Sequence, residues 1–126
     1  MRVDGIDHMV LTVRNIEETC SFYSQVLGMQ IITFGSSRKA LTFGCQKINL
    51  HQAGKEIEPK AAKPIPGSAD FCFVTKTSME EIVKHVCDLG IEIELGPIER
   101  TGAMGRLESI YIRDPDGNLI EISNYK

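Results

Sequence analysis

The sequence predicts an α+β protein built from two copies of one strand–helix–three-strand unit. The same spacing occurs twice in the chain: Gly28 and Gly90 lie 62 residues apart, and so do His8 and Asp70. Each half also contains an alternating strand, an amphipathic helix that ends at a glycine, and further short apolar strands. A repeat of this length indicates two supersecondary units that share a core.

In the first half, residues 5–13 alternate between apolar and polar, which is typical of a half-buried strand. Asn15 is a good cap for the helix that follows, and Gly28 suits the left-handed turn at its end. The inward face of this helix is predicted to carry Ile16, Cys20, Tyr23 and Leu27. Three short strands then follow, at Met29–Phe34, Ala40–Gly44 and Lys47–His51.

Residues 54–67 form the only long irregular stretch. Its three prolines exclude a helix interior and a central strand. The stretch is a linker between the halves or, alternatively, a loop that also borders a pocket.

The second half repeats the order, with a strand at 69–75 and a helix capped by Thr77 or Ser78. Residues 92–95 are predicted as a strand that ends at Pro97, and residues 100–105 as a flexible loop. The helix is expected to turn Met79, Ile82, Val86 and Leu89 inward. The last strands are predicted at Leu107–Arg113 and Leu119–Ser123, joined by the turn at 114–118.

Length and composition indicate one domain of ordinary globular type, with 126 residues and 42% hydrophobic side chains. We expect modules at about residues 4–53 and 68–126, with 54–67 between them. The net charge of −3 argues against a nucleic-acid partner, and no apolar run is long enough for a membrane span. The N-terminus has no apolar signal region, and the four cysteines lack CxxC spacing, so we expect reduced, buried thiols in a cytoplasmic protein.

Four polar residues form the candidate site. His8 and Asp70 occupy corresponding first strands, and His51 and Glu121 occupy corresponding last strands. A buried imidazole or carboxylate needs a partner, and a single residue of this kind is more often hydrogen-bonded structure than a ligand. Taken together, two imidazoles and two carboxylates are a sensible ligand set for a divalent transition metal, with positions left for water or substrate.

Other residues are candidates for contacts to a substrate. Asn49 shares strand parity with His51 and is expected to point into the same cavity. Basic side chains are available for an anion, although solvation alone explains each of them: Arg38, Lys39, Lys60, Arg100 and Arg106. No sequence context indicates an activated serine or cysteine nucleophile, and no phosphate-binding glycine motif is present.

Three segments resemble the glyoxalase I family within the vicinal oxygen chelate superfamily, which also contains bleomycin- and fosfomycin-resistance proteins. The segments are Asp7–Val13, the helix from Phe22-Tyr23 to Leu27-Gly28-Met29, and Asp114–Glu121. The middle of the chain is similar to the glyoxalase domain-containing protein 5 subgroup, whose bacterial members are labelled virulence or lactoylglutathione lyase-like proteins. That similarity is carried by Arg38–Leu41, Gln46–His51, Glu58–Ala61 and Pro66–Ser68.

The resemblance implies paired βαβββ modules that form a cupped sheet around a divalent metal, in a homodimer. By motif, His8 is the first-strand ligand, and Glu121 is the last-strand ligand and the proton-transfer base. The chain departs from the family pattern in two places: it has Asp70 where the second module normally begins with a ligand His, and it offers His51 where the first module of glyoxalase I ends with Glu.

We therefore predict a glyoxalase-like isomerase or lyase that holds a small substrate through vicinal oxygens. The predicted cofactor is Ni, Co, Mn, Fe or Zn, bound by His8, His51, Asp70 and Glu121, with Asn49 and Arg100 contacting the substrate. One alternative is a metal-free binding protein of the bleomycin-resistance type, in which the same polar residues are hydrogen-bonded structure. Dioxygenase or epoxide-opening chemistry is a further alternative.

Overall fold

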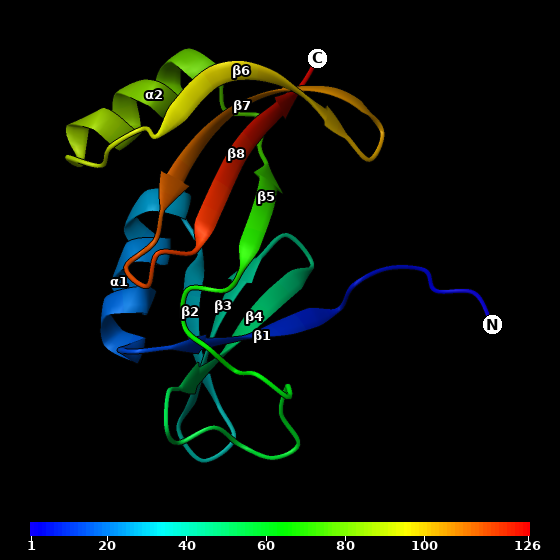
Figure 1. Cartoon of the computed structure of the whole chain (residues 1–126), viewed down its shortest axis with the longest axis vertical. Helices are drawn as coiled ribbons and strands as arrows, with labels where there is room; N and C mark the ends of the chain where they lie inside the picture. Colours follow the sequence, from blue (N-terminus) through cyan, green and yellow to red (C-terminus); the bar gives the residue numbers. More distant parts are fainter. The chain divides into compact units, whose positions relative to one another are not determined.

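The computed structural model describes all 126 residues, which divide into two compact units, Met1–Pro66 and Gly67–Lys126. Unit one contains β1 (His8–Val13), α1 (Ile16–Leu27), β2 (Gln30–Phe34), β3 (Arg38–Phe43) and β4 (Gln46–Gln52). Unit two contains β5 (Asp70–Val74), α2 (Met79–Asp88), β6 (Leu95–Gly102), β7 (Gly105–Arg113) and β8 (Leu119–Tyr125). The predicted α+β class and the repeated strand–helix–three-strand order are confirmed (Figure 1).

The two sheets have the same topology. Unit one has the order β1-β4-β3-β2 and unit two the order β5-β8-β7-β6. In each sheet the first and last strands of the unit pair in parallel, and the other neighbours pair antiparallel. The repeat seen in the sequence is therefore a repeat of sheet topology.

Each helix covers one face of the sheet in its own unit. In unit one, α1 contacts β2, β3 and β4, and its buried side chains include Cys20 and Tyr23. The strand residues of this core are almost inaccessible to solvent: Leu11, Val13, Leu41, Ile48 and Leu50. In unit two, α2 contacts β7, and the buried residues Ile110, Ile112, Ile120 and Ile122 alternate along β7 and β8. The opposite face of each sheet is left without a helix from its own unit.

Local capping explains where both helices begin, and a left-handed glycine ends the first. The Asn15 side chain accepts a hydrogen bond from the Glu18 amide at 2.9 Å, and Gly28 ends α1 with φ of 67°. Ser78 and Glu81 form a reciprocal capping box at the start of α2. Leu89, predicted to face inward, is 42% exposed because α2 ends one residue before it.

The largest error in the predicted elements lies at residues 92–105. The structure has a long strand at Leu95–Gly102 in place of a short strand and a flexible loop, and β6 and β7 form a hairpin. Pro97 does not end the strand because β6 is at the sheet edge, where a missing N–H is tolerated, and the register shifts between Leu95 and Ile98. Gly96 has φ of 110° at this shift, a value that favours glycine.

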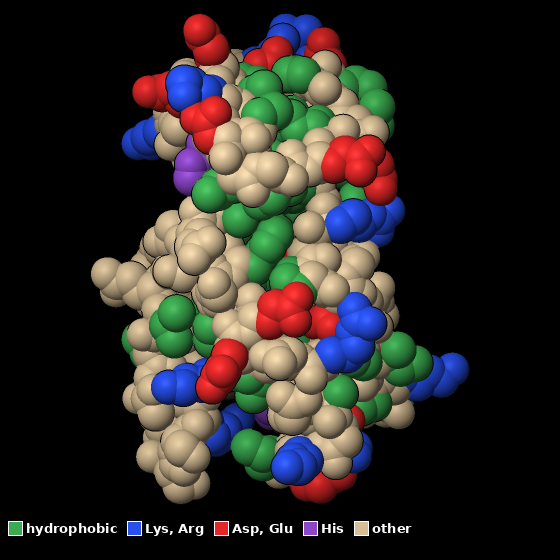
Figure 2. Space-filling view, turned by 90° about the vertical axis from the view of Figure 1, so that its left-hand side faces the viewer, with side chains coloured by type: hydrophobic (Ala, Val, Ile, Leu, Met, Phe, Trp, Pro, Cys, Tyr) green, Lys and Arg blue, Asp and Glu red, His purple; other side chains and the backbone are tan.

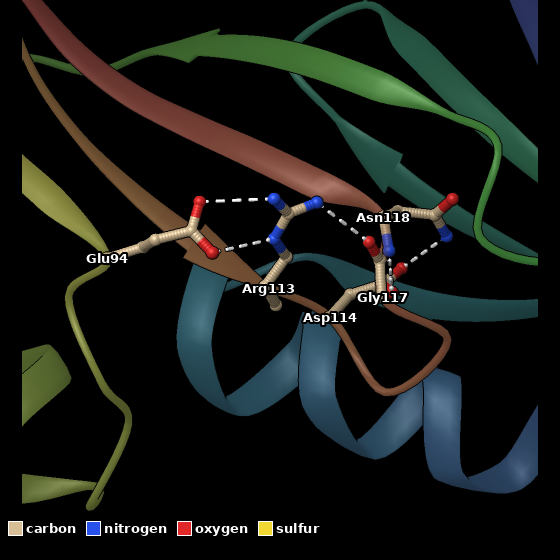
Figure 3. A network of polar contacts seen from close by, with 5 residues as sticks. All are labelled: Glu94, Arg113, Asp114, Gly117 and Asn118. Carbon is tan, nitrogen blue, oxygen red and sulfur yellow. Dashed lines mark hydrogen bonds and ion pairs between the residues drawn. The ribbon is translucent and has the colours of Figure 1, made fainter.

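The turn between β7 and β8 is held by a polar network in which Asp114 and Asn118 are buried and Arg113 and Glu94 are half exposed (Figure 3). Asp114 accepts hydrogen bonds from the backbone and the side chain of Asn118, and Arg113 bridges the Gly117 carbonyl and both oxygens of Glu94. This network fixes the start of β8, the strand that carries Glu121.

The surface carries no large field of a single charge on the side drawn in Figure 2, where acidic and basic side chains are interspersed. Neither α1 nor α2 has the length and apolar character of a membrane-spanning helix.

The expectation that all cysteines are buried is wrong for three of them: Cys20 is buried, whereas Cys45, Cys72 and Cys87 are exposed.

Candidate functional site

The predicted site residues lie on the helix-free faces of the two sheets. Residues directly opposite each other in neighbouring strands share a face. In unit one the pairs are His8 with Lys47, Val10 with Asn49, and Thr12 with His51. The predicted shared parity of Asn49 and His51 is thus confirmed.

His8 is the first residue of β1, and its side chain is 46% exposed. The expectation of a buried imidazole is wrong, because the strand begins at this residue and not before it. The His8 Nδ1 atom lies 2.7 Å from Asp7 Oδ1, which orients the ring and leaves Nε2 for another partner. A carboxylate behind a histidine in this manner is typical of metal-binding histidines.

His51 and Asn49 are buried polar side chains of this face, with exposures of 4% and 5%, and Thr12 opposite His51 is buried as well. The Nδ1 atom of His51 and the Oδ1 atom of Asn49 have no hydrogen-bond partner. Burial lowers the pKa of His51, and the charge of Arg38 lowers it further, against the opposing effect of Glu56. Together, these effects favour the neutral form of the His51 ring.

The structure places His8 and His51 at opposite ends of the β1–β4 pair. Since His8 lies opposite Lys47, four residues separate the two histidines along the strand direction, a distance of about 13 Å. Unit one therefore does not bring the two imidazoles together.

The strand registers also correct the predicted correspondence between the two halves. His8 opposite Lys47 corresponds to Asp70 opposite Leu119, so the equivalent of Glu121 is two residues along β4 from Lys47. That residue is Asn49, whereas His51 corresponds to Ser123. Aligning the two halves by sequence paired His51 with Glu121 and was wrong by two residues. Nothing in the sequence marks which residues of neighbouring strands lie opposite each other.

In unit two, three residues in register form a row around Glu121, and Arg100 of the fourth strand reaches this row from opposite Leu107. Cys72 of β5 and Tyr111 of β7 lie directly opposite Glu121 of β8. Arg100 of β6 donates from Nε to the Tyr111 hydroxyl at 2.9 Å, and its guanidinium lies 5.5 Å from the centre of the Tyr111 ring. The Oε1 atom of Glu121 is buried and has no hydrogen-bond partner.

The groups beside Glu121 stay protonated. Burial raises the pKa of the Cys72 thiol, and the charge of Glu121 and hydrogen bonding to it raise it further, against the hydrogen bond from Ser123. Burial also raises the pKa of Tyr111, and Glu121 adds to this increase, whereas Arg100 opposes it. A neutral thiol and a neutral phenol therefore flank the carboxylate, and both are able to donate a hydrogen bond to it.

Asp70 is the first residue of β5 and is exposed, so the expected buried carboxylate is absent there too. It lies two residues before Cys72 on the same face. The hydrogen bond to Glu94 raises the pKa of Arg113, and the charge of Asp70 adds a smaller increase. No group of three or more His, Cys, Asp and Glu side chains is gathered around a possible metal position. The four-residue ligand set stays a prediction.

The residues that sequence reasoning missed are those that surround Glu121 and His51. Tyr111 and Cys72 carry no motif, and only their position opposite Glu121 reveals them. Arg38 was expected as a solvated loop residue, but it is the first residue of β3 and its Nε atom is buried. A correct strand register would have found all three.

Comparison with known proteins identifies the family. The profile of the glyoxalase/bleomycin resistance protein/dioxygenase superfamily matches residues 5–122. The chain belongs to this superfamily. It is 59% identical to virulence protein STM3117 of Salmonella typhimurium over 99% of this chain and 87% of that protein. The crystal structure of STM3117 superimposes with a TM-score of 0.98, with 100% of both chains covered.

Two further relatives extend the comparison. The chain is 52% identical to the glyoxalase domain-containing protein RDO1 of Mycosarcoma maydis, over 100% of this chain and 71% of that protein. The fosfomycin resistance protein FosX of Listeria monocytogenes, solved with Mn(II) and sulfate, has the same fold. It is 19% identical, with a TM-score of 0.70 over 99% of this chain and 93% of FosX.

Proposed function

We propose that the protein is a metal-dependent, glyoxalase-like enzyme of the isomerase or lyase type. Its substrate is a small molecule held through two adjacent oxygen atoms, as in lactoylglutathione lyase-like proteins. The observation that carries this proposal is the buried, unpartnered Oε1 atom of Glu121 on the helix-free face of its sheet. A buried carboxylate oxygen without a partner is costly, so it is expected to bind a ligand, a proton or a metal.

The residues present fit a divalent metal ion. Glu121 offers a carboxylate oxygen without a partner, and Asp7 orients His8 so that its Nε2 atom is available. Nitrogen and oxygen donors of this kind suit Mn, Fe, Co, Ni and Zn. We take His8 and Glu121 as the principal ligands and Asp70 as a third. His51 is left out of this ligand set, because it lies about 13 Å from His8 along the strand direction and the positive charge of Arg38 acts on it.

A bound divalent ion supplies polarisation of a substrate oxygen and a lowered pKa for bound water. The chain's own contribution is the row around Glu121. Its Oε1 atom is positioned to accept a proton from the substrate, because the Tyr111 hydroxyl and the Cys72 thiol beside it stay protonated and do not compete for that proton. Arg100 holds the Tyr111 hydroxyl in place and supplies positive charge near the base.

Metal analysis tests this proposal. Protein purified without chelator and then offered Ni, Co, Mn, Fe and Zn is expected to bind about one ion per site, and Glu121→Gln is expected to lose most of it. Glu99→Gln is the matched control. Glu99 is an exposed strand carboxylate paired with Arg106, and as the neighbour of Arg100 in β6 it faces the other side of the sheet. A parent protein that takes up none of the five metals would refute the proposal.

A metal-free binding function is the second candidate. The observation in its favour is the set of buried, unpartnered atoms of Arg38, Asn49 and His51. A ligand that hydrogen-bonds to these atoms needs no metal. In that case ligand affinity is the same with and without chelator. The metal-dependent enzyme instead loses both activity and metal on treatment with chelator.

We also propose a homodimer. β1 is an edge strand, and it carries Met9 and Val10 with exposures of 38% and 47% next to Ile6 at 67%. Exposed apolar side chains on a sheet edge favour association with a second chain. Sedimentation equilibrium is expected to give twice the monomer mass of 14.0 kDa, and Val10→Lys is expected to shift the equilibrium toward the monomer.

A further inference from the structure

Three buried polar atoms without partners belong to neighbouring positions of β3 and β4 on the helix-free face of unit one. They are Arg38 Nε, Asn49 Oδ1 and His51 Nδ1, and we call these three residues the Arg38 cluster. Buried polar atoms in folded proteins are paired in the great majority of cases. Three exceptions in one place therefore indicate a ligand.

The strand register places these residues within reach of one small molecule. Asn49 and His51 are two residues apart on β4 and share a face, so their Cα atoms are about 7 Å apart. Ala40 of β3 lies opposite Asn49, and Arg38 lies two residues further on, a diagonal separation of about 7–8 Å from Asn49. When the antiparallel register is continued two residues beyond the pair of Ala40 and Asn49, Arg38 lies opposite His51.

The charges around the cluster favour an anion. The Arg38 guanidinium lies 4.8 Å from the centre of the Phe34 ring, and the Lys47 ammonium lies 4.2 Å from it, so both cations are held on this face. Glu56 is the carboxylate that acts on His51, but backbone N–H groups and Lys60 lower its pKa and satisfy its charge. Arg38 has no such counterion.

The donors and acceptors define the ligand further. Arg38 Nε–H is a donor, and the neutral His51 ring is able to donate from Nδ1, whereas Asn49 Oδ1 is an acceptor that needs a donor from the ligand. Val10 lies directly opposite Asn49 on the same face and is 47% exposed, which provides an apolar contact.

We propose that the Arg38 cluster binds a small 2-hydroxycarboxylate with an apolar substituent. Arg38 and His51 donate hydrogen bonds to the carboxylate, Asn49 Oδ1 accepts one from the 2-hydroxyl group, and Val10 contacts the apolar substituent. This inference rests on the proposed function in treating the sheet face as a substrate site, and it names the substrate class. The binding contacts themselves require no metal.

Calorimetric titration with three matched probes tests the proposal on chelator-treated, full-length protein. Mandelate has every required group, phenylacetate lacks the hydroxyl, and mandelamide lacks the charge. Mandelate is expected to bind about tenfold or more tightly than either of the others, because each loses a hydrogen bond to a buried partner.

Two variants separate the contributions. Arg38→Met is expected to abolish the preference for mandelate over mandelamide, and Asn49→Leu the preference for mandelate over phenylacetate. Arg106→Met is the control, since Arg106 is an exposed arginine of unit two whose side chain is 73% exposed, and it is expected to change neither preference. Because each readout is a ratio of two affinities within one variant, a partial loss of folded protein does not imitate the result.

Equal binding of the three probes, no binding of mandelate, or an Arg38→Met variant with its preference intact would overturn the inference. Metal content, measured separately, distinguishes this failure from failure of the proposed function. Metal uptake without mandelate selectivity rejects the Arg38 cluster and leaves the metal proposal standing. Mandelate selectivity in a protein that takes up no metal supports the Arg38 cluster as a ligand site and rejects the metal proposal.

Discussion

The substitution Asp114→Asn removes one charged acceptor from the turn before β8 and leaves its shape unchanged. Asp114 is 5% exposed, and its Oδ1 atom accepts from the Asp116 and Asn118 amides, both at 2.9 Å. Its Oδ2 atom accepts from Asn118 Nδ2 at 2.7 Å. In the variant, an NH₂ group replaces this second acceptor and faces the NH₂ group of Asn118.

Asn118 cannot relieve the conflict by turning its amide over. Its Oδ1 atom already accepts from the Ala69 amide at 2.9 Å, and the side chain is fully buried. One buried donor therefore loses its partner in either orientation. A hydrogen bond to a charged acceptor contributes about 1.5–3 kcal/mol, and this figure already includes part of the cost of leaving its donor unpaired. We therefore expect the free energy of unfolding to fall by about 2–3 kcal/mol. For a chain of this length the melting temperature should fall by about 8–12 °C.

Urea denaturation followed by far-ultraviolet circular dichroism measures this loss, since the chain has no tryptophan for fluorescence. Asp88→Asn is the matched control: the same chemical change at an exposed carboxylate, paired only with Lys84 across one helical turn, should leave the urea midpoint unchanged. A free energy of unfolding for Asp114→Asn within about 0.5 kcal/mol of the parent would refute the reasoning.

Three further predictions concern the cap, the edge strand and a buried thiol. Ser78→Ala removes the capping box of α2 and should lower the free energy of unfolding by about 1 kcal/mol; an unchanged urea midpoint would contradict this. Gly96→Ala places a methyl group 2.4 Å from the Ser109 carbonyl at a φ of 110°, and should cost at least about 2 kcal/mol in the same assay, whereas a cost near zero would show that the strand moves freely. Burial raises the pKa of the Cys20 thiol, and the thiolate is the reactive form. Iodoacetamide should therefore modify Cys20 more slowly than exposed Cys45 at pH 8, and the rate at Cys20 should increase with pH. Equal rates at the two cysteines in peptide mapping would count against this prediction.

Much of the fold could be predicted from the sequence because its signals are local. The cap at Asn15, the left-handed turn at Gly28 and the cap at Ser78 each depend on residues within one helical turn. The alternation of apolar residues likewise identified most strands. The strand at Leu95–Gly102 was missed because Pro97 and Gly102 normally interrupt strands, and only the edge position of β6 permits them.

The candidate site was predicted less well, since it depends on pairing between distant segments. His8 and Asp70 were expected to be buried, yet both begin their strands and are exposed. Asn49 and His51, within β4 on the same face as His8, are buried instead. Nothing in the local sequence distinguishes the first residue of a strand from one in its middle.

By itself, the sequence determined that the chain contains two copies of one strand–helix–three-strand unit, and where both helices begin. It also determined which residues of one strand share a face of the sheet, because side chains alternate along a strand whatever its partner is. Only the tertiary structure decided which polar residues lie opposite one another: Glu121 with Cys72 and Tyr111, and Arg38 with His51. The physical reason is that hydrogen bonding between strands sets the register, and a shift of two residues preserves every face while it changes every neighbour.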